Sequence, residues 1–430
     1  MTAPQGAPAD PSGAGDAPWP STAGALTAAA ALLGFAAFES RTPVARDDFG
    51  YLMWGLQTQG APLAWVYGPE WLSYRRPANA FVWWLSAQSG IDGELARWCL
   101  VGLWVACGVG MLALARPSIG AWTTLGLLLL TNQVFVDLLT WRSWLTTAGS
   151  LAFLVFALVA MRHRRRPLVI ALFGTLSLGF KEMAAVALAG VLATSRHRGV
   201  GALLLAGLAV GAATSTEKLG LAHVPENVRY HIDTLALFVP AVPVMIAASF
   251  PRLPAWTLGL PMLLVFLPSP VHAAAFVVSA ATFLARERRW LPAVTVAFAL
   301  PLLGSAHARQ YMLEGWIILI VAMAARLPAA PVLWVAIAVL GLRPAVDFET
   351  HRRQLRSEFE AQRTFLRNFS APPAEHVYPT AHGWDLDVLY WVRGGATLEA
   401  SPPEGHQPVQ VGPLSGAWAD ARPTQGKGIK

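Results

Sequence analysis

The sequence predicts an all-α protein that crosses a membrane many times. Of its 430 residues, 55% are hydrophobic and only 13% are charged, about half the charged fraction of an ordinary soluble domain. The 18 tryptophans are spread over many apolar stretches, and tryptophan is enriched where membrane-spanning helices meet the lipid headgroups. Spanning helices satisfy their own backbone hydrogen bonds, so we expect a helix bundle with bilayer lipid around most of it.

The net charge of +7 does not indicate a nucleic-acid-binding protein. The basic residues stand in short clusters between apolar stretches and do not line one long polar face. Such clusters are typical of the cytoplasmic ends of membrane spans. We therefore expect the lipid bilayer as a partner and no nucleic acid.

The chain divides into parts of different composition. Residues 1–21 are rich in Pro, Gly, Ala and Ser, lack the basic start of a signal peptide, and are predicted to be a disordered leader. Residues 22–342 form the predicted transmembrane domain, with 39–95 as a helical first extracytoplasmic loop. Residues 343–398 are predicted to be a small extracytoplasmic tail, and 399–430 a disordered end.

Apolar segments recur through the transmembrane domain, and window reading gives about thirteen spans. They lie at 22–38, 96–115, 118–136, 143–161, 167–180, 183–195, 199–214, 234–250, 254–270, 271–285, 290–305, 311–325 and 328–342. A cytoplasmic N-terminus puts every basic cluster on the cytoplasmic side, as the positive-inside rule requires. These clusters lie at 162–166, 196–198 and 286–289, with single arginines at 116, 252 and 326.

The segment between the clusters at 162–166 and 196–198 is too short for two full crossings. Each arm has about 14 residues, or roughly 21 Å of helix, whereas the hydrocarbon core is about 30 Å thick. Lys181 and Glu182 stand at the tip and are therefore expected below the outer surface, as is Arg309 in a later short turn. Charges at this depth need a partner or a watered cavity, which favours function, with a local Lys181–Glu182 ion pair as the structural alternative.

Two adjacent carboxylates, Asp47 and Asp48, follow the first expected span. A carboxylate beside an acceptor hydroxyl can take its proton as that hydroxyl attacks a sugar carbon. Two carboxylates can also hold a divalent metal ion that organises the site, and no other part of the chain has metal-ligand spacing. The structural alternative is that the two aspartates cap the start of a helix. The spacing of the residues alone slightly favours this alternative over a catalytic role.

Basic and aromatic residues mark two further positions on the extracytoplasmic side. Tyr74, Arg75 and Arg76 precede Pro77, where the chain turns back toward the membrane. Arginine binds phosphate oxygens through two N–H groups, so a lipid phosphate is a suitable partner. Arg142 stands between two tryptophans and can contact a headgroup or a substrate. For the first position the alternative is anchoring at the membrane interface, and for Arg142 it is neutralisation by Asp137 in the same short turn.

The order of these motifs resembles the GT-C superfamily of membrane glycosyltransferases. The motifs are Asp47-Asp48, Tyr74-Arg75-Arg76-Pro77, Phe180-Lys181-Glu182-Met183 and Arg309-Gln310-Tyr311. The resemblance covers roughly residues 22–342, and the superfamily includes protein O-mannosyltransferases and lipid A aminoarabinose transferases, which take a sugar from a polyprenyl-phosphate carrier at the outer face. The chain departs from the family in having Asp48 where many relatives have Glu, and in having no repeat domain.

The resemblance implies roles for individual residues. Asp47 would be the catalytic base, and Asp48 would orient it or a divalent ion. Lys181 and Arg309 would bind the phosphate of the carrier. Some further candidates for substrate binding come from the resemblance and others from their charge and position. They are Tyr51, Tyr74, Arg75, Arg76, Arg142, Glu182 and Tyr311.

The function that this implies is sugar transfer from a polyprenyl-phosphate carrier to a glycan, lipid or protein acceptor. The reaction would invert the anomeric carbon and take place on the extracytoplasmic face of a bacterial inner membrane. Two other classes of protein stay open as alternatives. A transporter or flippase for lipid-linked sugars would also need many spans and buried charges. A catalytically inactive membrane scaffold would use the two acids only as helix caps.

Overall fold

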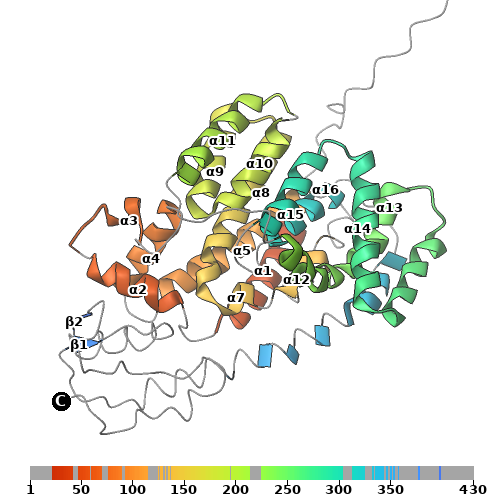
Figure 1. Cartoon of the computed structure of the whole chain (residues 1–430), viewed down its shortest axis with the longest axis horizontal. Helices are drawn as coiled ribbons and strands as arrows, with labels where there is room; N and C mark the ends of the chain where they lie inside the picture. The colour runs from red at the N-terminus through yellow and green to blue at the C-terminus, as the bar shows by residue number, and fades with distance from the viewer. Residues whose placement is uncertain are drawn as a thin grey trace, which may run out of the picture.

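The computed structural model is a bundle of helices (Figure 1). It describes residues 22–41, 47–58, 60–69, 76–89, 93–114, parts of 124–140, 141–193, 195–213, 224–303, 312–324, parts of 332–357, 376–377 and 397–398. The expected leader, the expected C-terminal end and most of the expected tail lie outside these residues. In the described part of the tail, two residues pair with two others as parallel strands, β1 (His376–Val377) and β2 (Thr397–Leu398).

The helices follow the apolar segments of the sequence. In chain order they are α1 (Thr22–Glu39), α2 (Asp47–Gln57), α3 (Ala64–Tyr67), α4 (Pro77–Ser89), α5 (Glu94–Leu114), α7 (Asp137–Thr140), η2 (Arg142–Trp144), α8 (Leu145–Arg162), α9 (Pro167–Phe180), α10 (Glu182–Ala193), α11 (Arg198–Ala213), α12 (Val224–Ala236), η4 (Val239–Ala241), α13 (Val242–Ser249), η5 (Ala255–Phe266), α14 (Ser269–Arg286), α15 (Leu291–Leu303) and α16 (Leu313–Ala324), where η denotes a 3-10 helix. Most ends of the described helices lie within two residues of the expected ones, whereas the expected segments 118–136 and 328–342 are described only in part.

Few of these helices are long enough to cross a bilayer by themselves. Among the described residues, Glu94–Leu114 and Arg142–Arg162 are long and apolar enough, and the second of them joins η2 to α8. A third candidate is the pair Val224–Ala236 and Val239–Ser249, which is bent by 58° at its break. The structure is therefore a helical bundle with a few apolar helices long enough to be candidate spans, and it does not establish the expected number of about thirteen.

The short helices α9 and α10 form a hairpin with Lys181 at its tip. A Cβ placed on Gly174 of α9 would lie 3.3 Å from the side chain of Leu188 in α10, and these two residues are equally far from Lys181 in the sequence. The two helices therefore run antiparallel. Figure 1 shows them side by side with α8 and α11.

The tip of this hairpin lies beside the second turn of α8. Ser150 Oγ donates a hydrogen bond of 3.1 Å to the carbonyl oxygen of Lys181, and Ser177 Oγ donates one of 2.9 Å to the carbonyl oxygen of Ser150. The longer helix begins at Arg142, and Lys181 Nζ contacts Thr147. At 1.5 Å per residue, the lysine contact lies about 8 Å along the helix from its start.

The two halves of the bundle meet where α10 packs on α15. A Cβ placed on Gly190 would lie 2.9 Å from Cα of Ala293, so this contact requires a glycine. Gly190 is near the end of α10 and Ala293 is near the start of α15. The basic clusters at 196–198 and 286–289, which adjoin these helix ends, therefore lie at the same end of the bundle, opposite the Lys181 tip.

Gly190→Ala should destabilise the fold by about 1–3 kcal/mol, because the methyl group meets backbone atoms that cannot rotate away. Gly102→Ala is the matched control, since nothing lies within 4 Å of a Cβ at that position on α5. Alanine favours a helix over glycine, so the control should be neutral or stabilising. Thermal unfolding of the two purified variants measures the difference, and equal midpoints would contradict the close packing of α10 on α15.

The bundle has a hydrophobic core, but some large apolar side chains are exposed and a few charged side chains are buried. Phe266 is 83% exposed and Leu168 is 78% exposed on the outer surface of the bundle. Asp48 and Glu314 are fully buried, and Lys181 is only 3% exposed. Acidic and basic side chains are almost never buried in soluble proteins unless they are paired, so each buried charge needs a partner.

Candidate functional site

Asp48 is buried where α2 meets η2. It is the second residue of α2, and its Oδ1 accepts a hydrogen bond of 2.6 Å from Ser143 Oγ. One turn further along α2, Tyr51 stacks on Trp83 of α4 with ring centroids 5.0 Å apart. This stacking holds α2 against α4 and thereby fixes the acidic end of α2 beside η2.

Lys181 is buried between three helices. Its Nζ lies 2.7 Å from Glu314 Oε1 of α16 and donates a hydrogen bond of 3.2 Å to Thr147 Oγ1 of α8. Every described residue of α16 is buried, so Glu314 has no access to water in this arrangement. Unpaired charges at such depth are strongly unfavourable, and the ion pair offsets the cost of burying each charge.

Glu182 has a different partner from its neighbour. Arg76, just before α4, donates to both carboxylate oxygens of Glu182, from Nε at 3.2 Å and from a terminal nitrogen at 3.0 Å. Both side chains are about one-fifth exposed. The close ion pairs of Lys181 and Glu182 therefore run to distant segments, in place of the local pair considered from the sequence. The two pairs tie the hairpin tip to α16 and α4.

Arg142 belongs to a second network next to Asp48. Its side chain is almost completely buried, and one terminal nitrogen lies 3.2 Å from Glu94 Oε1 at the start of α5. The other oxygen of Glu94 accepts a hydrogen bond of 2.8 Å from Arg97. Because Arg142 directly precedes Ser143, this network fixes the turn that holds Asp48.

Asp48 and Lys181 contact successive turns of one helix face. Ser143 and Thr147 are four residues apart in the continuous helix Arg142–Arg162, which places their Cβ atoms about 5–6 Å apart. We call Asp48, Ser143, Thr147, Lys181 and Glu314 the buried polar cluster. It brings two carboxylates, two hydroxyls and an ammonium group together at the junction of α2, α8, α16 and the hairpin tip.

Several predicted site residues lie outside the described residues. These are Tyr74, Arg75, Arg309 and Tyr311, and of Asp47 only the backbone is described, as the first residue of α2. Of Asp47, Lys181 and Arg309, which the resemblance makes the base and the phosphate-binding cations, the structure describes the side chain of Lys181 alone. Among the described residues, no three metal-ligating side chains cluster, and a metal at Asp47 and Asp48 stays a prediction.

Two acidic residues of the site, Glu314 and Glu94, are not among the site residues predicted from the sequence. Glu314 stands inside the apolar segment 311–325, and an ionisable residue within a span is by itself a signal of function. Glu94 stands at the start of an apolar segment, and acidic residues are common in the first turn of a helix because they interact favourably with the helix dipole. Only the first of these could have been found by a general rule.

No family model, curated protein or solved structure matches this chain. The resemblance to the GT-C superfamily therefore stays a prediction. Two features of the structure bear on function: the buried polar cluster and the exposed apolar surface.

Proposed function

We propose that the chain is an integral membrane glycosyltransferase of the GT-C type. It would move a sugar from a polyprenyl-phosphate carrier to a glycan, lipid or protein acceptor on the extracytoplasmic face of a bacterial inner membrane. The observation that carries the proposal is the contact of Asp48 and Lys181 with successive turns of one helix face, both in the interior of an apolar bundle.

The membrane location is supported by three features. Large apolar side chains such as Phe266 are exposed, and exposed apolar surface of this kind fits a lipid environment. Two helices have the length and composition of spans. Lys181, Glu182 and Arg142 each form an ion pair with a distant residue, as charges at membrane depth require.

The orientation is supported by the position of the basic clusters. The clusters at 162–166, 196–198 and 286–289 adjoin the ends of α8, α10 and α14. The hairpin and the contact of Gly190 with Ala293 put the second and third clusters opposite Lys181. The positive-inside rule assigns the arginine end to the cytoplasm, so the buried polar cluster lies toward the extracytoplasmic side.

The proposed reaction assigns one task to each kind of group. The acceptor O–H gives its proton to the carboxylate of Asp47 as its oxygen bonds to the anomeric carbon. The bond from that carbon to the carrier oxygen breaks on the opposite face, and its electron pair stays on the phosphate, so the configuration inverts. Asp48, held by Ser143, keeps the first turn of α2 in place.

Phosphate departure is the step that the cations would stabilise. A buried ammonium group is worth more to a developing negative charge than one in water, because the local dielectric constant is low. Lys181 would exchange Glu314 for the carrier phosphate, with Arg75 and Arg309 beside it. Arg76 holds Glu182 through two hydrogen bonds and would keep the hairpin tip in position.

A transporter for lipid-linked sugars is the second candidate. The 58° bend between Val224–Ala236 and Val239–Ser249 supports it, because broken helices form the substrate sites of many transporters. Transporters of this kind carry such helices in corresponding halves of an internal repeat, and the sequence shows no repeat.

One reconstituted assay separates the candidate classes. The purified full chain is placed in liposomes with a radiolabelled polyprenyl-phosphate sugar and a lipid-linked glycan acceptor. Label in the acceptor supports the transferase. Label that only changes leaflet supports the transporter, and binding of the carrier without either result supports the inactive scaffold; both of these outcomes overturn the transferase proposal.

A further inference from the structure

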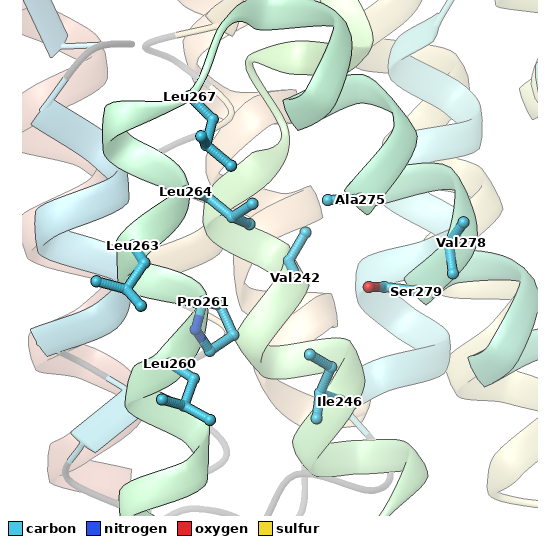
Figure 2. Close-up of a pocket in the computed structure, with 10 residues that line it drawn as sticks. All are labelled: Val242, Ile246, Leu260, Pro261, Leu263, Leu264, Leu267, Ala275, Val278 and Ser279. Carbon is cyan, nitrogen blue, oxygen red and sulfur yellow. The ribbon is translucent and has the colours of Figure 1, made fainter.

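An apolar groove lies between η5, α13 and α14, apart from the buried polar cluster. Its volume is about 320 Å³, and its walls include Val242 and Ile246 of α13, Leu264 of η5, and Ala275 of α14. Figure 2 shows α13 in the middle, with side chains of η5 on one side and of α14 on the other. Among the described residues that line the groove, Ser279 alone has a polar side chain.

The rim of the groove continues the exposed apolar surface. Leu263 is 63% exposed on the η5 side and Val278 is 64% exposed on the α14 side. The groove is open rather than enclosed, so a hydrocarbon chain in the surrounding bilayer can enter from the side. Its volume is at the lower end of the ~300–1,000 Å³ range of ligand pockets, which fits one lipid chain and not a whole lipid.

Arginines gather at one end of this groove. Arg286 at the end of α14 stacks over Phe250 just after α13, with its guanidinium carbon 4.2 Å from the ring centroid. Phe250 is one turn beyond Ile246 of the groove wall, or about 6 Å along the axis. Arg252 and Arg288 follow Phe250 and Arg286 by two residues each, and both are exposed.

The charge of this end is not neutralised by nearby acids. Glu287 forms an ion pair with Arg289 at 3.4 Å. Within the part of the chain that the structure describes, Arg252, Arg286 and Arg288 have no carboxylate at ion-pair distance. The groove thus has an apolar body and a positively charged end, which matches a molecule with a hydrocarbon chain and an anionic head.

We propose that the groove and its arginines bind an anionic phospholipid of the cytoplasmic leaflet. One acyl chain lies in the groove, and the phosphate contacts Arg252 and Arg286. The arginine end is level with the cluster at 196–198, because Gly190 packs on Ala293, and cytoplasmic leaflets carry anionic lipids. The site rests on the proposed membrane location but is independent of sugar transfer, since α10 separates this end of the bundle from Lys181.

Native mass spectrometry of the purified full chain tests this site. The protein is titrated with phosphatidylglycerol and with phosphatidylcholine of identical chains. The wild type should retain phosphatidylglycerol preferentially. Arg252→Gln with Arg286→Gln should weaken that binding about 30-fold, since an arginine near an anionic lipid surface contributes about fivefold. Ser279→Phe fills the groove and should weaken binding of both lipids.

Two control variants match these changes in chemistry. Arg165→Gln with Arg166→Gln removes the same charge from exposed positions at another cytoplasmic turn, and Ala281→Phe adds the same ring to an exposed position of α14. Both should bind like the wild type. The exposed arginines can be replaced without disturbing the core, so this double variant tests the site even if Ser279→Phe misfolds.

The possible failures can be told apart. Equal binding of the two lipids by the wild type, or unchanged binding by the Arg252→Gln, Arg286→Gln variant, overturns the lipid site. If the chain nevertheless resists extraction from membranes by alkaline carbonate, the membrane location stands. Release of the chain by carbonate would overturn the membrane location and, with it, the lipid site.

Discussion

Glu314→Gln should destabilise the folded protein by about 3–5 kcal/mol, which is the usual cost of removing one partner of a buried ion pair. Glu314 is fully buried, and its Oε1 lies 2.7 Å from Lys181 Nζ. The neutral amide removes the negative charge beside the buried ammonium group of Lys181, which also donates a hydrogen bond to the hydroxyl of Thr147. Thermal or denaturant unfolding of the purified variant measures the loss.

A double variant distinguishes a lost charge pair from lost packing. Lys181→Met with Glu314→Leu replaces both charges by apolar groups of similar size, and such replacements of buried pairs are often neutral or stabilising. We therefore expect stability close to the wild type but no sugar transfer, because the cation for the carrier phosphate is gone. Arg353→Gln is the control. It breaks the ion pair between Arg353 and Glu349, and because the Arg353 side chain is 78% exposed, the change should affect stability far less.

If Glu314→Gln unfolded at the same midpoint as Arg353→Gln, the buried pair would not be needed to hold α16 against the hairpin. If the double variant were as unstable as Glu314→Gln, the loss would come from packing and not from an unpaired charge. Either result would remove Glu314 from the proposed exchange with a carrier phosphate.

Asp47→Asn should lower the rate of sugar transfer by about 10²–10⁴-fold, the usual contribution of a general base. The amide keeps the size of the side chain but cannot take a proton from the acceptor hydroxyl. Expression, membrane insertion and unfolding midpoint should stay unchanged. The assay is transfer of radiolabelled sugar by the reconstituted variant, with donor binding measured in parallel.

The neighbouring acid gives the comparison within the same site. Asp48→Asn keeps an oxygen that can accept the hydrogen bond from Ser143, so it should lower transfer less than Asp47→Asn. Asp233→Asn, an exposed acid on α12, should have no effect. Full transfer activity in Asp47→Asn would show that Asp47 is not the catalytic base. A larger loss of activity in Asp48→Asn than in Asp47→Asn would assign that role to Asp48.

The helical class and many helix boundaries could be predicted because they depend on neighbouring residues. Proline at 167 starts α9, and the predicted and observed helix share the bounds 167–180. The segment 234–250, read as one span, is instead bent between α12 and α13. Prolines at 240 and 243 lack a backbone N–H and favour such a break, so this signal was present in the sequence.

The partners of the charged residues could not be read in the same way. The sequence placed Lys181 and Glu182 together at a hairpin tip, and the structure has this tip. The partner of each charge comes from another part of the chain, Glu314 for the lysine and Arg76 for the glutamate. Nothing in the spacing along the chain specifies these pairs.

The sequence by itself thus determined an apolar, helical chain with arginine clusters between its segments and charges at a short hairpin tip. These are local properties, set by the residues within one or two helical turns and by the solvent that they require. Only the tertiary structure decided that Asp48 and Lys181 contact adjacent turns of one helix and that Glu314 neutralises the lysine. Such contacts depend on how distant helices pack, because a buried charge takes whichever partner the packing brings within a few ångströms.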